Sequence, residues 1–437
     1  RMHYRMMQWL GLVLTALLVL SSFGMDPVPI SVTPAPVQAA VPELRPFGEL
    51  PPPSPTIPIA ADVRDGNVTA QFDGERNNYR LGTAVSTAGD INGDGLADLI
   101  IGAPGNNRAL VYLGDPDLGF SAEPFELNRG TANARFGAAV SVAGDTSGDG
   151  LSEIIVGAPG ANQAYIYRFE RSSVRPYATL QGGLSFGTAV ATAGDVNGDG
   201  FADVIVGAPA SNQVEIYSGA SFASTSTRLT LLNGTGQFGA TVDTAGDVNG
   251  DGFADIIVGA PGNNEAYIYL GSATGISNTP ALTLTGTGAF GTAVSTAGDL
   301  NGDGFSDIIV GAPDYEQLGS LIPGGAAFVY YGSSTGIVAT SVVTLSVSVP
   351  SPVAGDQFGA TVSTAGDLNG DGLTDLVIGA PGRADDTGEV HLYYGQLTPL
   401  SPSPNRTLAA PAGTTGFGAA VNTAGDLNGD GLSAIIV

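Results

Sequence analysis

A short loop near the start of the sequence crowds oxygen-bearing side chains around two glycines. It reads AGDINGDGLAD at 88–98 and contains Asp90, Asn92, Asp94 and Asp98. We number the loop from its first aspartate, so that these residues occupy positions 1, 3, 5 and 9. Carboxylates this close repel one another unless a cation lies between them. Because Ca2+ takes about 6–8 oxygen ligands, the loop predicts a calcium site.

The loop recurs along the chain. Seven copies begin at Asp90, Asp145, Asp195, Asp247, Asp299, Asp367 and Asp426, at intervals of fifty-odd residues that lengthen towards the end. Such a period is typical of a solenoid, a propeller or a domain array. In the copies after the first, the predicted side-chain ligands are Asp145, Ser147, Asp149 and Glu153; Asp195, Asn197, Asp199 and Asp203; Asp247, Asn249, Asp251 and Asp255; Asp299, Asn301, Asp303 and Asp307; Asp367, Asn369, Asp371 and Asp375; and Asp426, Asn428 and Asp430.

Two other interpretations of the loop were weighed. An EF-hand or a dockerin repeat needs a polar ligand at position 12, where the first copy has Ile101. A set of metal-free Asx-turns explains single Asp and Gly residues but leaves the clustered charge uncompensated. We therefore expect Ca2+ in copies one, three, four, five and six. Copy two, with Ser147 and Glu153, is expected to bind more weakly, and copy seven, with Ala434 at position 9, stays undecided.

Each copy sits in the same series of short apolar runs. In the third and fourth units these read FGTAVATAG at 186–194, DVIVGAP at 203–209, AYIYLG at 266–271 and ALTLTG at 281–286. Runs rich in Val, Ile, Tyr and Thr, bounded by Gly, Pro and Asn, predict strands. Four short strands in each repeating unit are what a β-propeller requires.

The order of FG, acidic loop and GAP resembles FG-GAP repeats over about residues 65–437. Such repeats form the seven-bladed propeller that heads integrin α subunits, and they occur in bacterial secreted proteins. The resemblance implies an all-β fold, a seven-bladed β-propeller. Its last blade is expected to be incomplete because copy seven ends at Val437 before any GAP. Repeats are expected near 81–130, 131–180, 181–232, 233–285, 286–350, 351–410 and 411–437.

The family pattern also implies further details. The backbone carbonyl at position 7 is a calcium ligand in the family, which corresponds here to Leu96, Leu151, Phe201, Phe253, Phe305 and Leu373. An N-terminal strand completes the last blade in the family, so residues 67–73 are expected beside the seventh repeat. The calcium loops lie on the lower face, and ligands meet the upper face.

The N-terminal residues indicate an export route. Positive residues precede an apolar run at 10–20, which predicts a secretory signal peptide over 1–24; the run is shorter than the roughly 20 residues of a membrane span. Residues 25–60 are rich in proline and predict a disordered linker, followed by the propeller at 61–437. The mature chain is therefore expected to be secreted or displayed on the cell surface, without a membrane span. Because residue 1 is Arg and the chain stops within a strand, we expect a fragment of a longer protein.

Composition narrows the function. A net charge of −26 argues against nucleic-acid binding, and the absence of cysteine excludes thiolate chemistry. The mature chain has one histidine, His391, which we interpret as a packed residue; no catalytic residues are predicted and we expect no enzyme.

The remaining classes are binder and scaffold. Long loops in the fifth and sixth units suggest a contact patch for a protein or glycan partner, comprising Tyr315, Gln317, Arg383, Asp385 and Asp386, although neutral loop variation explains them equally well. A lectin remains an alternative, but the single Trp, Trp9, falls in the signal segment. A non-catalytic scaffold of a larger protein, whose active domain is missing here, is the other alternative.

Overall fold

The computed structural model describes residues 79–437 except 118, 130, 132, 317–323 and 348–354. The chain divides into two units, Arg1–Ser54 and Pro55–Val437, and the description below concerns the second. The expectations for the signal peptide at 1–24, the linker at 25–60 and the strand at 67–73 lie outside the described residues. No helix in the described part of the chain is long and apolar enough to cross a membrane.

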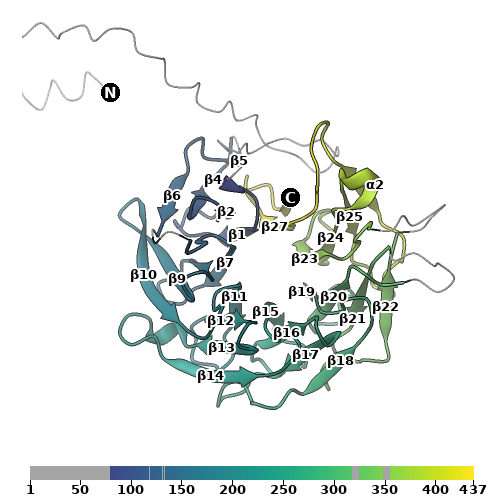
Figure 1. Ribbon diagram of the computed structural model, residues 1–437, viewed down its shortest axis with the longest axis horizontal. Helices are drawn as coiled ribbons and strands as arrows, with labels where there is room; N and C mark the ends of the chain where they lie inside the picture. Colours follow the sequence, from purple (N-terminus) through teal and green to yellow (C-terminus); the bar gives the residue numbers. More distant parts are fainter. Residues whose placement is uncertain (1–78, 118, 130, 132, 317–323, 348–354) are drawn as a thin grey trace, which may run out of the picture. The chain divides into compact units, whose positions relative to one another are not determined.

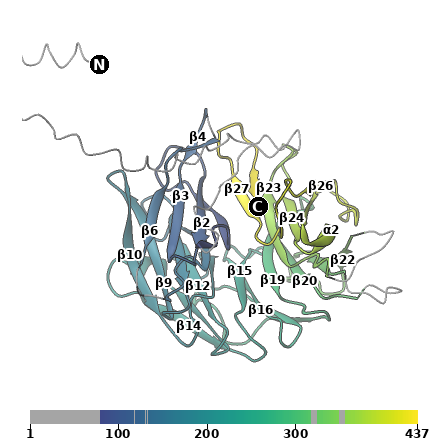
Figure 2. The ribbon, with the colours of Figure 1, turned by 45° about the horizontal axis from the view of Figure 1, so that its top comes forward.

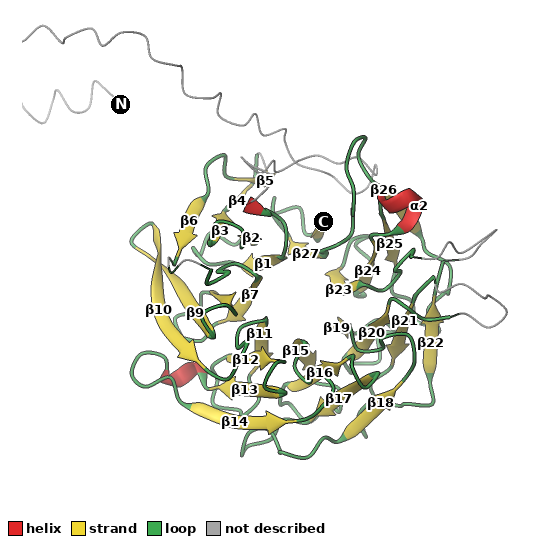
Figure 3. Cartoon of the chain, in the orientation of Figure 1, coloured by secondary structure: helices red, strands yellow, loops and turns green. Residues whose placement is uncertain are grey.

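Strands make up almost all of the regular structure, as Figure 3 shows. They form six antiparallel four-stranded sheets set around a centre, which is a β-propeller (Figure 1). Blade one consists of β1 (Val85–Gly89), β2 (Asp98–Ala103), β3 (Arg108–Tyr112) and β6 (Phe125–Asn128); blade two of β7 (Ala139–Gly144), β8 (Glu153–Ala158), β9 (Gln163–Glu170) and β10 (Ser173–Gln181); blade three of β11 (Ala189–Gly194), β12 (Asp203–Ala208), β13 (Gln213–Tyr217) and β14 (Arg228–Asn233); blade four of β15 (Thr241–Gly246), β16 (Asp255–Ala260), β17 (Glu265–Tyr269) and β18 (Leu282–Thr285); blade five of β19 (Ala293–Gly298), β20 (Asp307–Ala312), β21 (Ala326–Tyr330) and β22 (Val342–Leu345); blade six of β23 (Thr361–Gly366), β24 (Asp375–Ala380), β25 (Glu389–Tyr393) and β26 (Arg406–Ala409).

The remaining elements are short. A two-residue pair, β4 (Gly114–Asp115) and β5 (Gly119–Phe120), follows β3, and a 3-10 turn, η3 (Gly219–Ser221), follows β13. One turn labelled α2 (Arg383–Asp386) lies between β24 and β25. The predicted all-β propeller is thus confirmed.

The expectation of seven blades is wrong, because the described residues form six. The seventh repeat contributes only β27 (Asn422–Gly425) and β28 (Ala434–Ile436), which pair with each other. This pair lies between blade six and blade one, since β27 contacts both β23 and β1 (Figures 1 and 2). Asn422 bridges the two neighbours: its Nδ2 donates to the carbonyl of Val85, and its Oδ1 accepts from Ser363 Oγ. Two strands therefore occupy the gap without forming a blade.

Each blade buries its second strand completely. All six residues of β2, β8, β12, β16, β20 and β24 are buried. Sheets packed between neighbouring sheets have two dry faces, so such strands read as continuous apolar runs. This explains why DVIVGA-type segments lack the alternation of a half-exposed strand.

The FG and GAP motifs are the two sides of one contact between blades. A Cβ atom added to Gly207, the glycine of one GAP, would overlap the carbonyl oxygen of Gly239, the glycine of the next FG. The same relation joins Gly102 to Gly137 and Gly311 to Gly359. Only glycine lets two backbones approach this closely. The preceding phenylalanines, Phe136, Phe186, Phe238, Phe290 and Phe358, are fully buried.

We expect Gly207→Ala to destabilise the propeller strongly, because the obstacle is backbone that cannot move aside. A loss of about 3 kcal/mol or more in the free energy of unfolding is expected, measured by chemical denaturation. Gly275→Ala is the control: Gly275 has φ +82° but no atom within 4 Å of the added Cβ. It should cost about 1 kcal/mol from backbone strain alone. Equal losses in the two variants would contradict the contact.

Candidate metal loops and the opposite face

The seven acidic loops have nearly the same local structure. In the first, the Asp90 carboxylate accepts hydrogen bonds from the amides of Gly93 at 2.6 Å and Gly95 at 2.9 Å. Both glycines have φ near +80°, which a side chain would resist. Asn92 Oδ1 accepts from the amide of Asp94, whose own carboxylate accepts from the amide of Leu96. The position-1 aspartates Asp145, Asp195, Asp247, Asp299, Asp367 and Asp426 accept the same pair of glycine amides.

The acid at position 9 is the buried member of the loop. Asp98 is fully buried; its Oδ2 accepts from the amide of Ile91 and its Oδ1 from the amide of Gly114, beyond the third strand. One carboxylate thus joins the loop between strands one and two to the loop between strands three and four. Asp203, Asp255, Asp307 and Asp375 repeat both bonds.

Burial makes these carboxylates difficult to ionise. It raises the pKa of Asp98, Asp203, Asp255 and Asp307 to about 7 and that of Asp375 to about 6, against the amide hydrogen bonds, which lower it. The carboxylates at positions 1 and 5 raise each pKa further by repulsion. Ionised, such a group is stabilised by a nearby positive charge.

Copy two departs from this pattern, as its sequence indicated. Glu153 is buried, and its Oε2 accepts from both the amide and the hydroxyl of Thr146, each at 2.7 Å. Burial raises the pKa of Glu153, while these hydrogen bonds lower it. Copy seven keeps Asp426, Asn428 and Asp430 but has Ala434 at position 9, so the acid that joins the two loops elsewhere is missing.

The side chains at position 7 do not line their own loops. Phe201 lies against Gly148, at position 4 of the preceding loop. Leu96, Leu151, Phe253, Phe305 and Leu373 lie likewise against Gly429, Gly93, Gly198, Gly250 and Gly302. Every acidic loop is therefore covered by the next repeat.

The donor set fits a hard cation in chemistry rather than in a finished geometry. Each of five loops offers three carboxylates and an amide oxygen, with one carboxylate fully buried. Among the described residues, however, no three acidic or histidine side chains converge closely enough to hold a metal ion. The carboxylates accept hydrogen bonds from their own loop amides instead. The site residues of the loops therefore remain predictions.

The loops joining strands two and three meet those joining strands four and one at the opposite, upper face. There the amide of Gly262 donates to the carbonyl of Gly236, and that of Gly416 to Asp386. Of the predicted contact residues, Tyr315 lies on blade five and packs edge-on against Phe328. Gln317 lies outside the described residues. Arg383, Asp385 and Asp386 lie together on blade six in α2, with both aspartates exposed.

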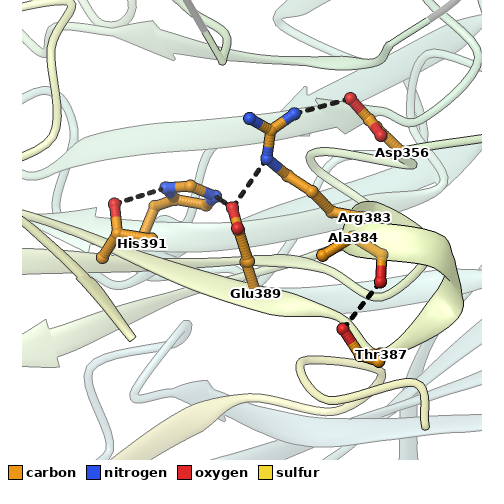
Figure 4. Close-up of polar contacts among 7 residues, drawn as sticks. Asp356, Arg383, Ala384, Thr387, Glu389 and His391 are labelled. Atoms are coloured by element: carbon orange, nitrogen blue, oxygen red, sulfur yellow. Dashed lines mark hydrogen bonds and ion pairs between the residues drawn. The ribbon is translucent and has the colours of Figure 1, made fainter. Parts of the chain in front are cut away.

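Arg383 is the fixed base of that turn (Figure 4). Its Nη1 donates to Asp356 Oδ2 at 2.7 Å and its Nε to Glu389 Oε2 at 2.6 Å. Asp356 is buried, so the pair is protected from water. Ala384, Asp385 and Asp386 above it have φ of 55°, 58° and 65°, a left-handed turn that ordinary side chains rarely adopt. Sequence reasoning missed Asp356 and Glu389, since neither stands in a repeated acidic loop.

His391 lies beneath this network and is packed, as the sequence indicated. Its Nδ1 lies 3.1 Å from Thr407 Oγ1, and its ring contacts Phe358 at 5.3 Å between centroids. Burial, together with the charge of Arg383, lowers the pKa of His391 to about 4. It is therefore neutral near pH 7.

Removing Arg383 should leave two acids without a partner. We expect Arg383→Ala to lower the free energy of unfolding by about 2–3 kcal/mol, since breaking a buried pair strands the remaining charge. Arg108→Ala is the matched control, because the Arg108–Glu126 pair is much more exposed, and it should cost about 0–1 kcal/mol. Thermal and urea unfolding measure both. A loss no larger than that of the control would show that the network carries no stability.

Sequence comparisons agree with the geometry. A model of the FG-GAP-like repeat matches residues 90–156 and 247–310, and a model of the FG-GAP repeat matches residues 186–224 and 358–393. Integrin alpha-PS5 of Drosophila melanogaster is 34% identical over 168 residues, 36% of this chain and 16% of that protein. Integrin alpha-5 of Xenopus laevis is 34% identical over 192 residues, 35% of this chain and 17% of that protein.

These matches cover about a sixth of the length of those relatives. The solved structure of Saccharomyces cerevisiae Sqt1 overlaps this chain loosely, with TM-score 0.49 and 11% identity over 80% of this chain and 79% of that one. The matched repeats, the motifs that join the blades and the propeller itself agree: this chain carries FG-GAP repeats, similar to those of integrin alpha chains, and they build its β-propeller.

Proposed function

We propose that this chain is a secreted or cell-surface β-propeller that binds a protein or glycan partner through its upper face and is stabilised by Ca2+ in the loops of its lower face. The observation that carries the proposal is the contrast between the two faces. The lower face repeats one acidic loop, whereas the upper face differs between blades. Function concentrates in variable loops on a rigid scaffold.

The calcium part is supported by the loop chemistry. Five buried position-9 carboxylates share loops with two further acids each, and burial alone makes their charge costly. A divalent cation would offset both the burial and the mutual repulsion. Asp, Asn and backbone oxygens are the donors that Ca2+ prefers.

The binding part is supported by blades five and six. In blades one to four the connection from strand two to strand three is a tight turn such as residues 209–212, whereas blades five and six use residues 313–325 and 381–388. Asp385 and Asp386 are exposed on a turn whose base is held by Arg383. A partner with a basic group at its contact surface suits this pair of acids.

Asp385→Asn combined with Asp386→Asn should weaken partner capture about tenfold or more if these acids contact it. Capture is measured by probing a glycan array and a panel of extracellular proteins with the labelled chain. Glu123→Gln is the control, because Glu123 is an exposed acid on blade one. Equal capture by both variants would exclude the blade-six turn. Binding of the wild type to glycans alone would make it a lectin, and no binding at all would leave a scaffold.

Calcium should raise the melting temperature. A cation that binds only the folded chain stabilises it by about 2.7 kcal/mol per independent site at a hundredfold excess over Kd. Melting curves in millimolar Ca2+ and in chelator measure the effect, with Mg2+ as the ion control. Curves that coincide would contradict calcium binding altogether.

A single loop can be tested by counting ions. We expect Asp251→Asn to lower the Ca2+ stoichiometry, measured by isothermal titration, by one. Asp243→Asn is the control: Asp243 lies in the same blade but outside the loop, where it accepts a hydrogen bond from Ser295 Oγ at 2.8 Å. An unchanged count for Asp251→Asn would reject Asp251 as a ligand.

A further inference from the structure

Blade two differs from the other blades at its outer edge. In the other five, the third strand ends at a tyrosine: Tyr112, Tyr217, Tyr269, Tyr330 or Tyr393. The equivalent residue in blade two is Tyr167, because it pairs with Ile154 directly after the position-9 acid, as Tyr217 pairs with Val204. Here β9 continues to Glu170, and β10 returns from Ser173 (Figures 1 and 2). We call residues 168–175 the blade-two ribbon.

The ribbon has one apolar face and one arginine face. Phe169 pairs with Val174 across the strands, and the Phe169 ring meets Phe125 of blade one edge-on at 5.8 Å between centroids. Because side chains alternate along a strand, the neighbouring pair, Arg168 with Arg175, faces the other way. The apolar face fixes the ribbon to blade one, and the arginine face is left for other contacts.

The arginine face is unfavourable for folding. Like charges directly opposite each other destabilise a pair of strands. Arg168 has an ion pair with Glu170. Arg171, at the turn, and Arg175 are exposed, and neither has an ion pair among the described residues, although the chain carries a net charge of −26. An acidic protein that leaves arginines unpaired and opposed gains nothing in stability from them.

The same face is held in place. The Arg168 guanidinium lies over the ring of Tyr177, 4.5 Å from its centroid, and Tyr177 meets Phe222 of blade three edge-on. Stacking on a ring fixes the plane of a guanidinium while its N–H groups stay able to donate. Guanidinium groups in fixed positions recognise carboxylate and sulfate groups through paired hydrogen bonds.

We propose that the blade-two ribbon binds an acidic polysaccharide, with Arg168 and Arg175 holding one sulfate or carboxylate group and Arg171 contacting the next along the polymer. This rests on the proposed extracellular binding function but uses a different surface. Tyr177 also lies within the field of Asp145 and Asp149, so acids flank the ribbon. They would repel a duplex with one charge per about 1.7 Å, whereas a polysaccharide with about one charge per sugar fits between them.

Binding is measured by biolayer interferometry in Ca2+ with four probes: dextran sulfate, an oligouronate, neutral dextran and single-stranded DNA. The wild type should bind one or both acidic polysaccharides, which identifies the anion, and should not bind neutral dextran. Arg168→Gln with Arg175→Gln should weaken that binding about tenfold or more. Arg108→Gln, which removes one arginine from an exposed ion pair of blade one, should change it less than about twofold.

Arg175→Gln alone separates binding from folding. It removes a like charge from the opposed pair, so the melting temperature should stay the same or rise while polysaccharide binding falls. A lower melting temperature with unchanged binding would make the arginine a structural residue and overturn the proposal. Equal binding of neutral dextran, or tighter binding of DNA, would also overturn it. Loss of the upper-face partner with the ribbon intact would instead count against the proposed function alone.

Discussion

The propeller depends on one backbone hydrogen bond that is repeated at every junction between repeats. The amide at position 8 of each acidic loop donates to the carbonyl at position 1 of the preceding loop: Ser152 to Asp90, Ala202 to Asp145, Ala254 to Asp195, Ser306 to Asp247, Thr374 to Asp299 and Ser433 to Asp367. The series closes when Ala97 donates to Asp426 at 2.8 Å. Seven loops thus form a closed circle although only six blades are present. The two strands of the last repeat are enough to keep the circle unbroken.

This circle explains why the acidic loop tolerates so little change. Its position-1 residue must offer a carbonyl to the next repeat and a carboxylate to two of its own amides. Its glycine at position 4 must leave room for the side chain at position 7 of the next repeat. Any cation held by the loop would therefore stiffen a junction between blades as well as a single blade. Because each loop touches its neighbour, a change of position at one loop reaches the next through direct contact.

Much of this could be predicted from the sequence because the constraint is local and repeated. Strand runs, glycine turns and the acidic loops follow from residue types that recur in register, and the structure contains them where the motifs stand. The number of blades could not be predicted, because it depends on whether two strands at the end of the described chain count as a blade. The Arg383 network was also missed: Asp356, Arg383 and Glu389 come from separate segments, and only folding brings them together.

The places where the repeat is broken are therefore the informative ones. At the lower face and at the glycine contacts every blade must satisfy both neighbours, so a departure there disturbs two junctions. The turn at Arg383 and the ribbon at Arg168 lie at the ends of strands, where a longer loop adds residues without moving a neighbour. Each also keeps an unfavourable feature, a left-handed turn in one and opposed arginines in the other. Unfavourable local structure persists only where something else maintains it, and in a ring this regular, ligand binding is the physical role left for residues that the scaffold does not need.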